Sequence, residues 1–215
     1  GDRLLVIYSR EILAAKPGST IISEVKASQS LYDDIAKRGG RGIMWKTGHS
    51  LIKAKMKEES AVLAGEMSGH MFFADRYFGY DDAVYASCRL VEILAKTQRP
   101  LSTLVADLPK TVVTPEIRVD LPDTVKFNVV ERVRLRFSEY LQSKQGLGPS
   151  KLVLRDLITI DGVRGIFDDG WGLVRASNTQ PALVLRFEAT FSAQLNVIRT
   201  IVEEELLEAK RAVGC

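Results

Sequence analysis

Cysteine is scarce in this 215-residue chain, which contains only Cys88 and Cys215. A disulfide framework needs several paired cysteines, so the sequence predicts a protein of a reducing compartment. Cys88 lies in an apolar stretch that we expect to be helical, where it is predicted to be a small buried side chain. The spaced Cys and His ligands of a zinc motif are also absent, and we therefore expect no metal site in this chain.

Long apolar runs and a strong excess of one charge are absent as well. The longest apolar stretches fall short of a membrane span, and the "LLVIY" at the start leads into Arg10 and Glu11 rather than a cleavable signal, so we expect a cytoplasmic protein without a membrane partner. Lysine and arginine total 30 against 27 acids, a net charge of +3. This excess is too small to predict binding to nucleic acid, and the arginines of "RVRLRF" (132–137) fit a solvated helix face better.

The first half of the chain alternates between helical and strand-like segments. Helices are expected over 4–15, 30–40 and 50–60, and strand-like runs are "TIISEV" (20–25), "RGIMW" (41–45) and "AVLAGE" (61–66). Asp81 and Asp82 precede a further apolar helix as expected N-terminal caps. This alternation predicts a mixed α/β domain over residues 1–108 with parallel strands.

The second half has a different rhythm, and prolines at 100, 109 and 115 separate the two. "TPEIRVDL" (114–121) resembles a strand, 125–142 a helix, and "QGLGPS" (145–150) a loop. Three further strand-like runs, 157–169, 170–177 and 181–189, precede a closing helix over 191–212. We expect an α+β domain over 111–215, built as an antiparallel four-stranded sheet with two helices.

Polar residues follow each of the three strands expected in the first half. Lys26 comes after the first strand, Lys46 to Ser50 with His49 after the second, and Glu66 to His70 ("EMSGH") after the third. Ligands of α/β layers bind at the carboxyl ends of the strands, so these segments form a candidate site. Glu66, Ser68 and His70 offer hydrogen-bonding groups that suit adjacent hydroxyls of a sugar; a plain polar turn is the alternative.

A second candidate site is "RASNTQP" (175–181), between two strands of the second half. The planar guanidinium of Arg175 suits a phosphate. Ser177 and Thr179 offer hydroxyls, and backbone N–H groups in a tight turn with Asn178 can form an anion-binding nest. The alternative is an ordinary hydrophilic hairpin turn, for which Ser, Asn and Thr are common.

Together these segments resemble one family, the α-D-phosphohexomutases, and within it the branch that acts on mannose and glucose phosphates. The matching pieces are "EVKAS", "WKTGHSLIK", "GEMSGH", "RYFGYDD" and "GWGLVRASNTQPALVLRFEA", in this order and over nearly the whole chain. The methionine of "GEMSGH" favours this branch over the phosphoglucosamine mutases. The resemblance covers only the third and fourth domains of a four-domain enzyme.

The resemblance implies roles for individual residues. Lys26 and His49 would assist proton transfer at the reacting sugar, while Glu66 and Ser68 would bind sugar hydroxyls in a loop shaped by His70. The phosphate that is not being transferred would be held by Arg175, Ser177, Asn178 and Thr179.

It further implies an enzyme that interconverts hexose 1-phosphate and hexose 6-phosphate through a bisphosphorylated hexose. The complete enzyme would use Mg²⁺, a phosphorylated serine and hexose 1,6-bisphosphate as activator. The serine and the metal loop would belong to N-terminal domains that this chain lacks. The alternatives are a stand-alone phosphosugar-binding or regulatory module and a fragment of a phosphoglucosamine mutase.

Overall fold

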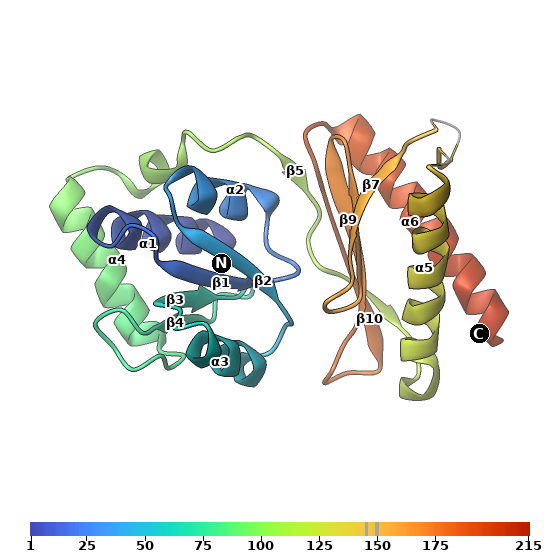
Figure 1. Ribbon diagram of the computed structural model, residues 1–215, viewed down its shortest axis with the longest axis horizontal. Coiled ribbons are helices and arrows are strands. Elements are labelled where there is room, and N and C mark those ends of the chain that lie inside the picture. The colour runs from blue at the N-terminus through green and yellow to red at the C-terminus, as the bar shows by residue number, and fades with distance from the viewer. Residues whose placement is uncertain (145, 149–150) are drawn as a thin grey trace. The chain divides into compact units, whose positions relative to one another are not determined.

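The computed structural model describes residues 1–144, 146–148 and 151–215 (Figure 1). The chain separates into two compact units, Gly1–Pro109 and Lys110–Cys215, and each contains its own sheet and hydrophobic core.

The first unit is an α/β layer around a four-stranded mixed sheet. Its elements are α1 (Asp2–Ala15), β1 (Thr20–Glu24), α2 (Gln29–Lys37), β2 (Arg41–Trp45), α3 (His49–Glu58), β3 (Leu63–Gly65), β4 (Met71–Phe73), α4 (Ala83–Thr97) and the short 3₁₀ helix η1 (Leu101–Val105). The sheet order is β2-β1-β3-β4; β1 pairs in parallel with β2 and β3, and β4 runs antiparallel to β3. Because β1, β2 and β3 are parallel, their carboxyl ends lie at the same edge of the sheet.

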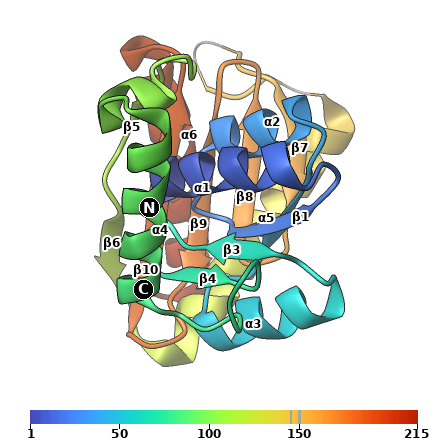
Figure 2. The ribbon, with the colours of Figure 1, turned by 90° about the vertical axis from the view of Figure 1, so that its left-hand side faces the viewer.

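Helices cover both faces of this sheet, as Figure 2 shows with α1 and α2 on one side and α3 on the other. Successive strand residues point to opposite faces, so Ile21 packs with the core beneath α1, α2 and α4 while Ile22 packs with Ile52 and Met56 of α3. The expected α/β architecture is therefore confirmed for this part of the chain.

Two expectations for the α4 region need correction. Asp82 caps α4, since its carboxylate accepts a hydrogen bond of 2.9 Å from the Tyr85 N–H, whereas Asp81 takes no part in the cap. Cys88 is exposed, and not buried as predicted, because it lies on the side of α4 opposite to Ala86 and Arg89. The apolar sequence of α4 hid this, since apolar side chains occupy both its buried and its exposed side.

The second unit is an antiparallel sheet covered on one face by two long helices, α5 (Asp123–Ser143) and α6 (Ser192–Val213). Its strands are β5 (Val112–Val113), β6 (Ile117–Asp120), β7 (Leu154–Ile158), β8 (Val163–Phe167), β9 (Gly170–Ala176) and β10 (Ala182–Ala189). The order is β5-β10-β9-β8-β7, and β6 also pairs with β10. The α+β class is confirmed, but the sheet has six strands rather than four.

The difference in strand number has two causes. Residues 157–169, expected as one run, contain the last two residues of β7 and all of β8, joined by a turn at Asp161 and Gly162. Gly162 has a φ of +87° that favours glycine. The two-residue β5 is too short to give a sequence pattern. The core lies between the sheet and the helices and includes Val133, Phe137, Leu185 and Ile198.

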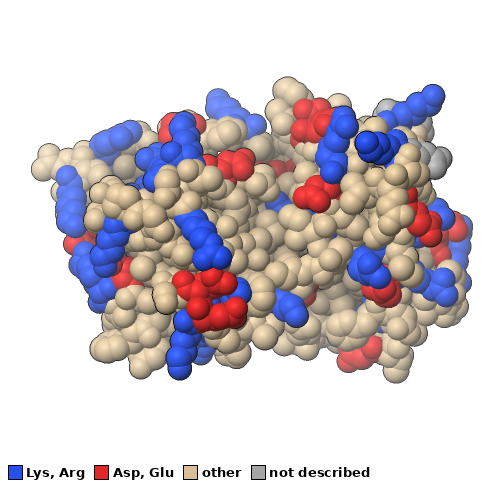
Figure 3. Space-filling view, viewed as in Figure 1, with Lys and Arg blue, Asp and Glu red and all other residues tan. Residues whose placement is uncertain are grey.

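Several remaining expectations concern the surface. The predicted loop 145–150 falls partly outside the described residues, and Leu147 forms an isolated β-bridge with Leu152. Arg134 and Arg136 of "RVRLRF" form ion pairs with glutamates, and Figure 3 shows basic and acidic side chains interspersed on the visible face. Of the helices in the described part of the chain, none combines the length and apolarity that crossing a membrane requires.

Candidate functional site

The carboxyl edge of the first sheet brings together the three polar segments that the sequence singled out. Lys26 follows β1 and is buried, with 6% of its surface exposed. His49 is the first residue of α3 and is exposed, with its Nδ1 at 3.5 Å from the Ser50 hydroxyl oxygen. Residues 66–70 form the turn between β3 and β4, which we call the β3–β4 loop.

Glu24, which was not among the predicted site residues, links these three segments. Its side chain is fully buried at the end of β1. One carboxylate oxygen accepts hydrogen bonds from the Lys26 N–H (2.6 Å) and the Thr47 hydroxyl (3.3 Å). The other oxygen accepts a bond of 3.0 Å from the Met67 N–H, so that one carboxylate holds the chain after each of the three strands.

Electrostatics around Glu24 reflect two opposing effects. Burial raises the pKa of the Glu24 carboxyl, and the positive charge of Lys26 partly offsets this. The neighbouring carboxylate of Glu66 adds to the rise. A signal for Glu24 did exist in the sequence: an acidic residue directly follows the strand-like run "TIIS" (20–23), and buried acids are rare unless they have partners.

Glu66 connects the β3–β4 loop to the segment after β2. Its carboxylate accepts hydrogen bonds from the Gly48 N–H and the Ser68 hydroxyl, both of 3.2 Å. Glu66 is 6% exposed, whereas Ser68 is exposed. This geometry leaves the Ser68 side chain as the more accessible of the two, with Glu66 directly behind it.

His70 ends the β3–β4 loop and is held by an acidic partner. Its Nδ1 lies 2.5 Å from a carboxylate oxygen of Asp81, and the other Asp81 oxygen accepts a bond of 3.2 Å from the Met71 N–H. The turn itself is closed by backbone bonds between Glu66 and His70 and by Gly69, whose φ is +106°. Asp81, expected as a helix cap, therefore orients the imidazole of His70.

In the second unit, residues 177–181 connect β9 to β10 and form what we call the β9–β10 turn. The hydroxyl oxygen of Ser177 accepts bonds from the N–H groups of Thr179 (3.3 Å) and Gln180 (3.2 Å). These two N–H groups thus have a partner inside the turn. The side chains of Asn178 and Thr179 are exposed, so they are the accessible groups of the turn.

Buried cations lie on either side of this turn. Arg175 is 4% exposed and forms an ion pair of 2.9 Å with Asp161, so its guanidinium is oriented by a carboxylate. Lys126 of α5 is also 4% exposed, and its ammonium donates to the backbone carbonyls of Ser177 (2.6 Å) and Gln180 (2.9 Å). The same ammonium forms an ion pair of 2.6 Å with Asp123. No sequence pattern indicated Lys126, because it precedes the turn by about fifty residues and the pattern around it predicts only a helix.

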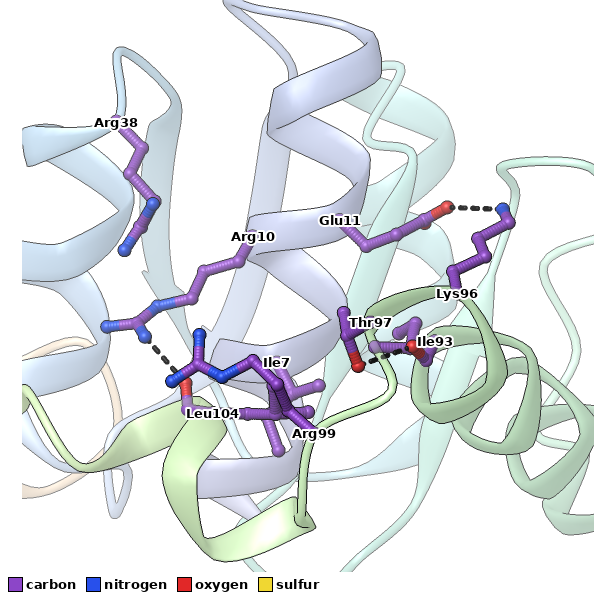
Figure 4. A pocket seen from close by; sticks show the side chains of 9 residues that line it. All are labelled: Ile7, Arg10, Glu11, Arg38, Ile93, Lys96, Thr97, Arg99 and Leu104. Atoms are coloured by element: carbon purple, nitrogen blue, oxygen red, sulfur yellow. Dashed lines mark hydrogen bonds and ion pairs between the residues drawn. The ribbon is translucent and has the colours of Figure 1, made fainter.

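A cavity of about 310 Å³ lies elsewhere in the first unit, between α1, the end of α4 and η1 (Figure 4). Its floor includes Ile7 and Ile93, and Arg10 lines its side. The Arg10 guanidinium already bonds to Asp34, Asp107 and the Leu104 carbonyl. Because its guanidinium is occupied by these bonds, Arg10 connects α1 to α2 and to η1, and its role is structural.

Comparison with known proteins assigns the family. Residues 1–112 match the family model of the phosphoglucomutase/phosphomannomutase α/β/α domain III, and residues 116–205 match the model of the C-terminal domain of the same enzymes. The chain therefore belongs to the phosphoglucomutase/phosphomannomutase family.

Individual relatives agree with this assignment. A phosphomannomutase/phosphoglucomutase of Pseudomonas putida is 45% identical over 209 residues, which are 97% of this chain and 42% of that protein. A phosphoglucomutase of Neisseria gonorrhoeae is 42% identical, over 92% of this chain and 40% of its own length. The crystal structure of a Burkholderia thailandensis family protein superposes with a TM-score of 0.82 at 41% identity, and 42% of that protein is covered. The chain thus spans about two fifths of the length of these relatives.

Proposed function

We propose that this chain supplies the sugar-binding and phosphate-binding parts of a phosphohexomutase that interconverts mannose or glucose 1-phosphate and 6-phosphate through a bisphosphorylated hexose. The observation that supports this most is the arrangement at the carboxyl edge of the first sheet. There Lys26, Glu66 and Ser68 come from two segments held together by one buried carboxylate, Glu24.

In the first unit, the β3–β4 loop would bind adjacent hydroxyls of the hexose ring. The Ser68 hydroxyl is exposed and the Glu66 carboxylate behind it can accept a hydrogen bond, which are complementary groups for a diol. His49 and Lys26 would act in proton transfer at the reacting oxygen, since an imidazole titrates near neutral pH. His70, oriented by Asp81, would fix the end of the loop.

In the second unit, the β9–β10 turn would bind the phosphate that is not transferred. Asn178 and Thr179 present exposed polar side chains, and Arg175 and Lys126 would provide charged donors nearby, each oriented by a carboxylate partner, Asp161 and Asp123. A charged donor close to a phosphate strengthens its hydrogen bonds.

The transfer step itself needs a phosphoryl donor and charge neutralisation at the moving group. Among the residues that the structure describes, no group of three His, Cys, Asp or Glu side chains could hold a metal ion. These described residues therefore do not fit a magnesium site. We place both the donor serine and the Mg²⁺ ligands of the complete enzyme in domains outside this chain, with hexose 1,6-bisphosphate as its activator.

Two measurements test the proposal. Calorimetric titration of the purified chain with glucose 1-phosphate should show weak binding, and a coupled assay should show no turnover even with Mg²⁺ and glucose 1,6-bisphosphate. A chimera that joins the N-terminal part of the Pseudomonas putida relative to Gly1 should interconvert the two hexose phosphates.

Other outcomes would decide against it. Turnover by the chain alone would require a donor within these 215 residues and would refute the division of roles. Tight binding by the chain, combined with an inactive chimera, would favour a stand-alone phosphosugar-binding module. A clear preference of the active chimera for glucosamine phosphates would favour a phosphoglucosamine mutase.

A further inference from the structure

Helix α4 has an exposed side that is apolar along its whole length. Ala86, Arg89 and Ile93 are its buried residues. On the opposite side, the exposed positions are Ala83, Val84, Ser87, Cys88, Val91 and Ala95. Positions 84, 88, 91 and 95 follow one another at helical spacing, so they form a single stripe, and every residue in it is small or apolar.

The exposure of this stripe is large. Val84 is 75% exposed and Val91 is 64% exposed. A helix at the surface of a globular protein normally has charged or polar side chains on its outer side. The exposed side of α4 is as apolar as the side of a helix that packs in a protein core. For this reason the sequence predicted that Cys88 would be buried.

Aromatic side chains extend the surface beyond the start of α4. In the loop between β4 and α4, Phe78 is 76% exposed and Tyr80 is 58% exposed, and their rings stack with centroids 5.7 Å apart. Tyr77 connects this pair to α4, because its ring stacks on Tyr85 at 3.9 Å. We call the surface formed by Phe78, Tyr80, Val84, Cys88 and Val91 the α4 face; exposed apolar surfaces that are contiguous in this way mark interaction sites.

The location of the chain start indicates what covers the α4 face. A β-carbon on Gly1 would lie 2.2 Å from the Glu66 carbonyl oxygen and 2.9 Å from the Gly69 nitrogen, so Gly1 lies against the β3–β4 loop. That loop ends at His70, which pairs with Asp81 at the start of α4. In a protein as long as the relatives, the chain preceding Gly1 would therefore enter beside the first turn of α4.

We infer that the α4 face is the docking surface for the preceding domain of the complete enzyme. The family model places domain III over residues 1–112, and more than half of each relative lies outside the matched region. A tethered domain needs only modest intrinsic affinity, because the linker keeps it at a high effective concentration. The inference depends on family membership and on this surface, and it does not depend on the catalytic roles proposed above.

Cys88 is a natural reporter of the coverage, and Cys215 is the matched control, since both are exposed and they are the two cysteines of the chain. We would measure thiol labelling by Ellman's reagent, resolved by peptide mass spectrometry, in the 215-residue chain and in the chimera with the Pseudomonas putida N-terminal part. Cys88 should label at about the rate of Cys215 in the chain and roughly tenfold or more slowly in the chimera, because labelling then requires opening of the interface. Cys215 should label equally in both proteins.

Substitutions at the same surface sharpen the test. Val84→Asp should speed the labelling of Cys88 in the chimera and leave the melting temperature of the 215-residue chain nearly unchanged. Leu207→Asp makes the same kind of change at a half-exposed leucine of α6 and should not affect Cys88 labelling in either protein. A cysteine at the aligned position of the complete Pseudomonas putida enzyme should also label slowly, which checks that the chimera docks normally.

Two results would overturn the inference. Equal, fast labelling of the reporter cysteine in the chain, the chimera and the complete relative would show that the preceding domain leaves the α4 face uncovered. Slow labelling in the chain alone that becomes fast on dilution would show that a second copy of this chain covers it instead.

Discussion

Replacement of Glu24 by glutamine tests the central feature of the first unit. The oxygen that accepts bonds from the Lys26 N–H and the Thr47 hydroxyl can be replaced by the amide oxygen. The amide nitrogen would then face the Met67 N–H, which is a donor and loses its acceptor. A buried donor left without a partner costs about 1–3 kcal/mol, so we expect the free energy of unfolding to fall by that amount. Glu24→Ala removes the acceptor of all three donors and should cost roughly 3–5 kcal/mol.

The loss should depend on pH in a defined direction. Burial raises the pKa of Glu24 in the folded protein above its ordinary value of 4.5. The folded state then binds the proton more tightly than the unfolded state, so this group's contribution to stability is complete below about pH 4.5 and falls as the pH rises through the raised value. Glutamine does not titrate. The stability difference between wild type and Glu24→Gln should therefore be largest near pH 4.5 and shrink towards pH 8.

The assay is urea unfolding followed by tryptophan fluorescence. The chain has two tryptophans, Trp45 in β2 and Trp171 in β9, so a Trp171→Phe background makes the signal specific for the first unit. Glu58→Gln is the control, because Glu58 is 64% exposed and its surface ion pair should contribute less than about 1 kcal/mol. A Glu24→Gln protein as stable as wild type at pH 5, or a difference that grows with pH, would refute the reasoning.

Three further substitutions test the rest of the structure. Glu66→Ala should weaken binding of glucose 1-phosphate about tenfold in calorimetry, because sites built around hydroxyls depend on such bonds. Glu58→Ala, the same change at a glutamate that is 64% exposed, should leave the binding unchanged. Lys126→Met should lower the unfolding free energy of the second unit by about 1–3 kcal/mol and weaken phosphate binding, since the buried Ser177 carbonyl and the partly buried Gln180 carbonyl lose their donor; unchanged denaturation would exclude this role. Although burial opposes it, hydrogen bonds from arginines lower the pKa of Asp34 below its ordinary 3.8. Asp34→Asn should therefore destabilise the protein above about pH 4, with the difference from wild type disappearing as the pH falls through the lowered native value; Asp33→Asn, an exposed control, should show no such trend.

The sequence predicted the long helices and strands of the fold correctly, but it did not predict the number of strands. Long periodic segments such as α1 and α6, and strands bounded by glycine or proline, gave clear patterns. The three-residue β4 and the two-residue β5 are too short for a pattern, and they form because β3 and β10 offer open edges to pair with. The β7–β8 hairpin was missed because the expected run 157–169 joined the last two residues of β7 to β8, although Asp161-Gly162 is a recognised hairpin signal.

For the candidate site, the sequence indicated the loops but not what holds them. Loop residues were found because glycines and polar side chains follow apolar strands. Glu24 was missed because a charged residue is not expected at a buried position of a strand. Its burial is stabilised by hydrogen bonds from three donors, which the sequence does not show. Lys126 was missed because its contact with the β9–β10 turn joins residues about fifty positions apart, which a single sequence does not show.

The two missed residues explain how each loop presents its polar groups. Glu24 draws the Met67 N–H inward, and Glu66 does the same with the Gly48 N–H. The groups left at the surface of the β3–β4 loop are a hydroxyl, that of Ser68, and an imidazole, that of His70. A surface of this kind exchanges hydrogen bonds with neutral hydroxyls, and it carries little fixed charge of its own.

The β9–β10 turn is arranged in the opposite sense. The ammonium of Lys126 binds the carbonyl oxygens of Ser177 and Gln180, so the negative ends of these two peptide dipoles point into the protein. Carbonyl oxygens that pointed outward would repel an anion. Because these two point inward, the side chains of Asn178 and Thr179 are the groups at the surface of the turn. Because the Lys126 ammonium is itself paired with Asp123 at 2.6 Å, the main effect of Lys126 on the turn is the direction that it gives to these carbonyls. This direction supports the proposal that the turn binds phosphate, in addition to the hydroxyl and amide groups that the sequence of the turn supplies.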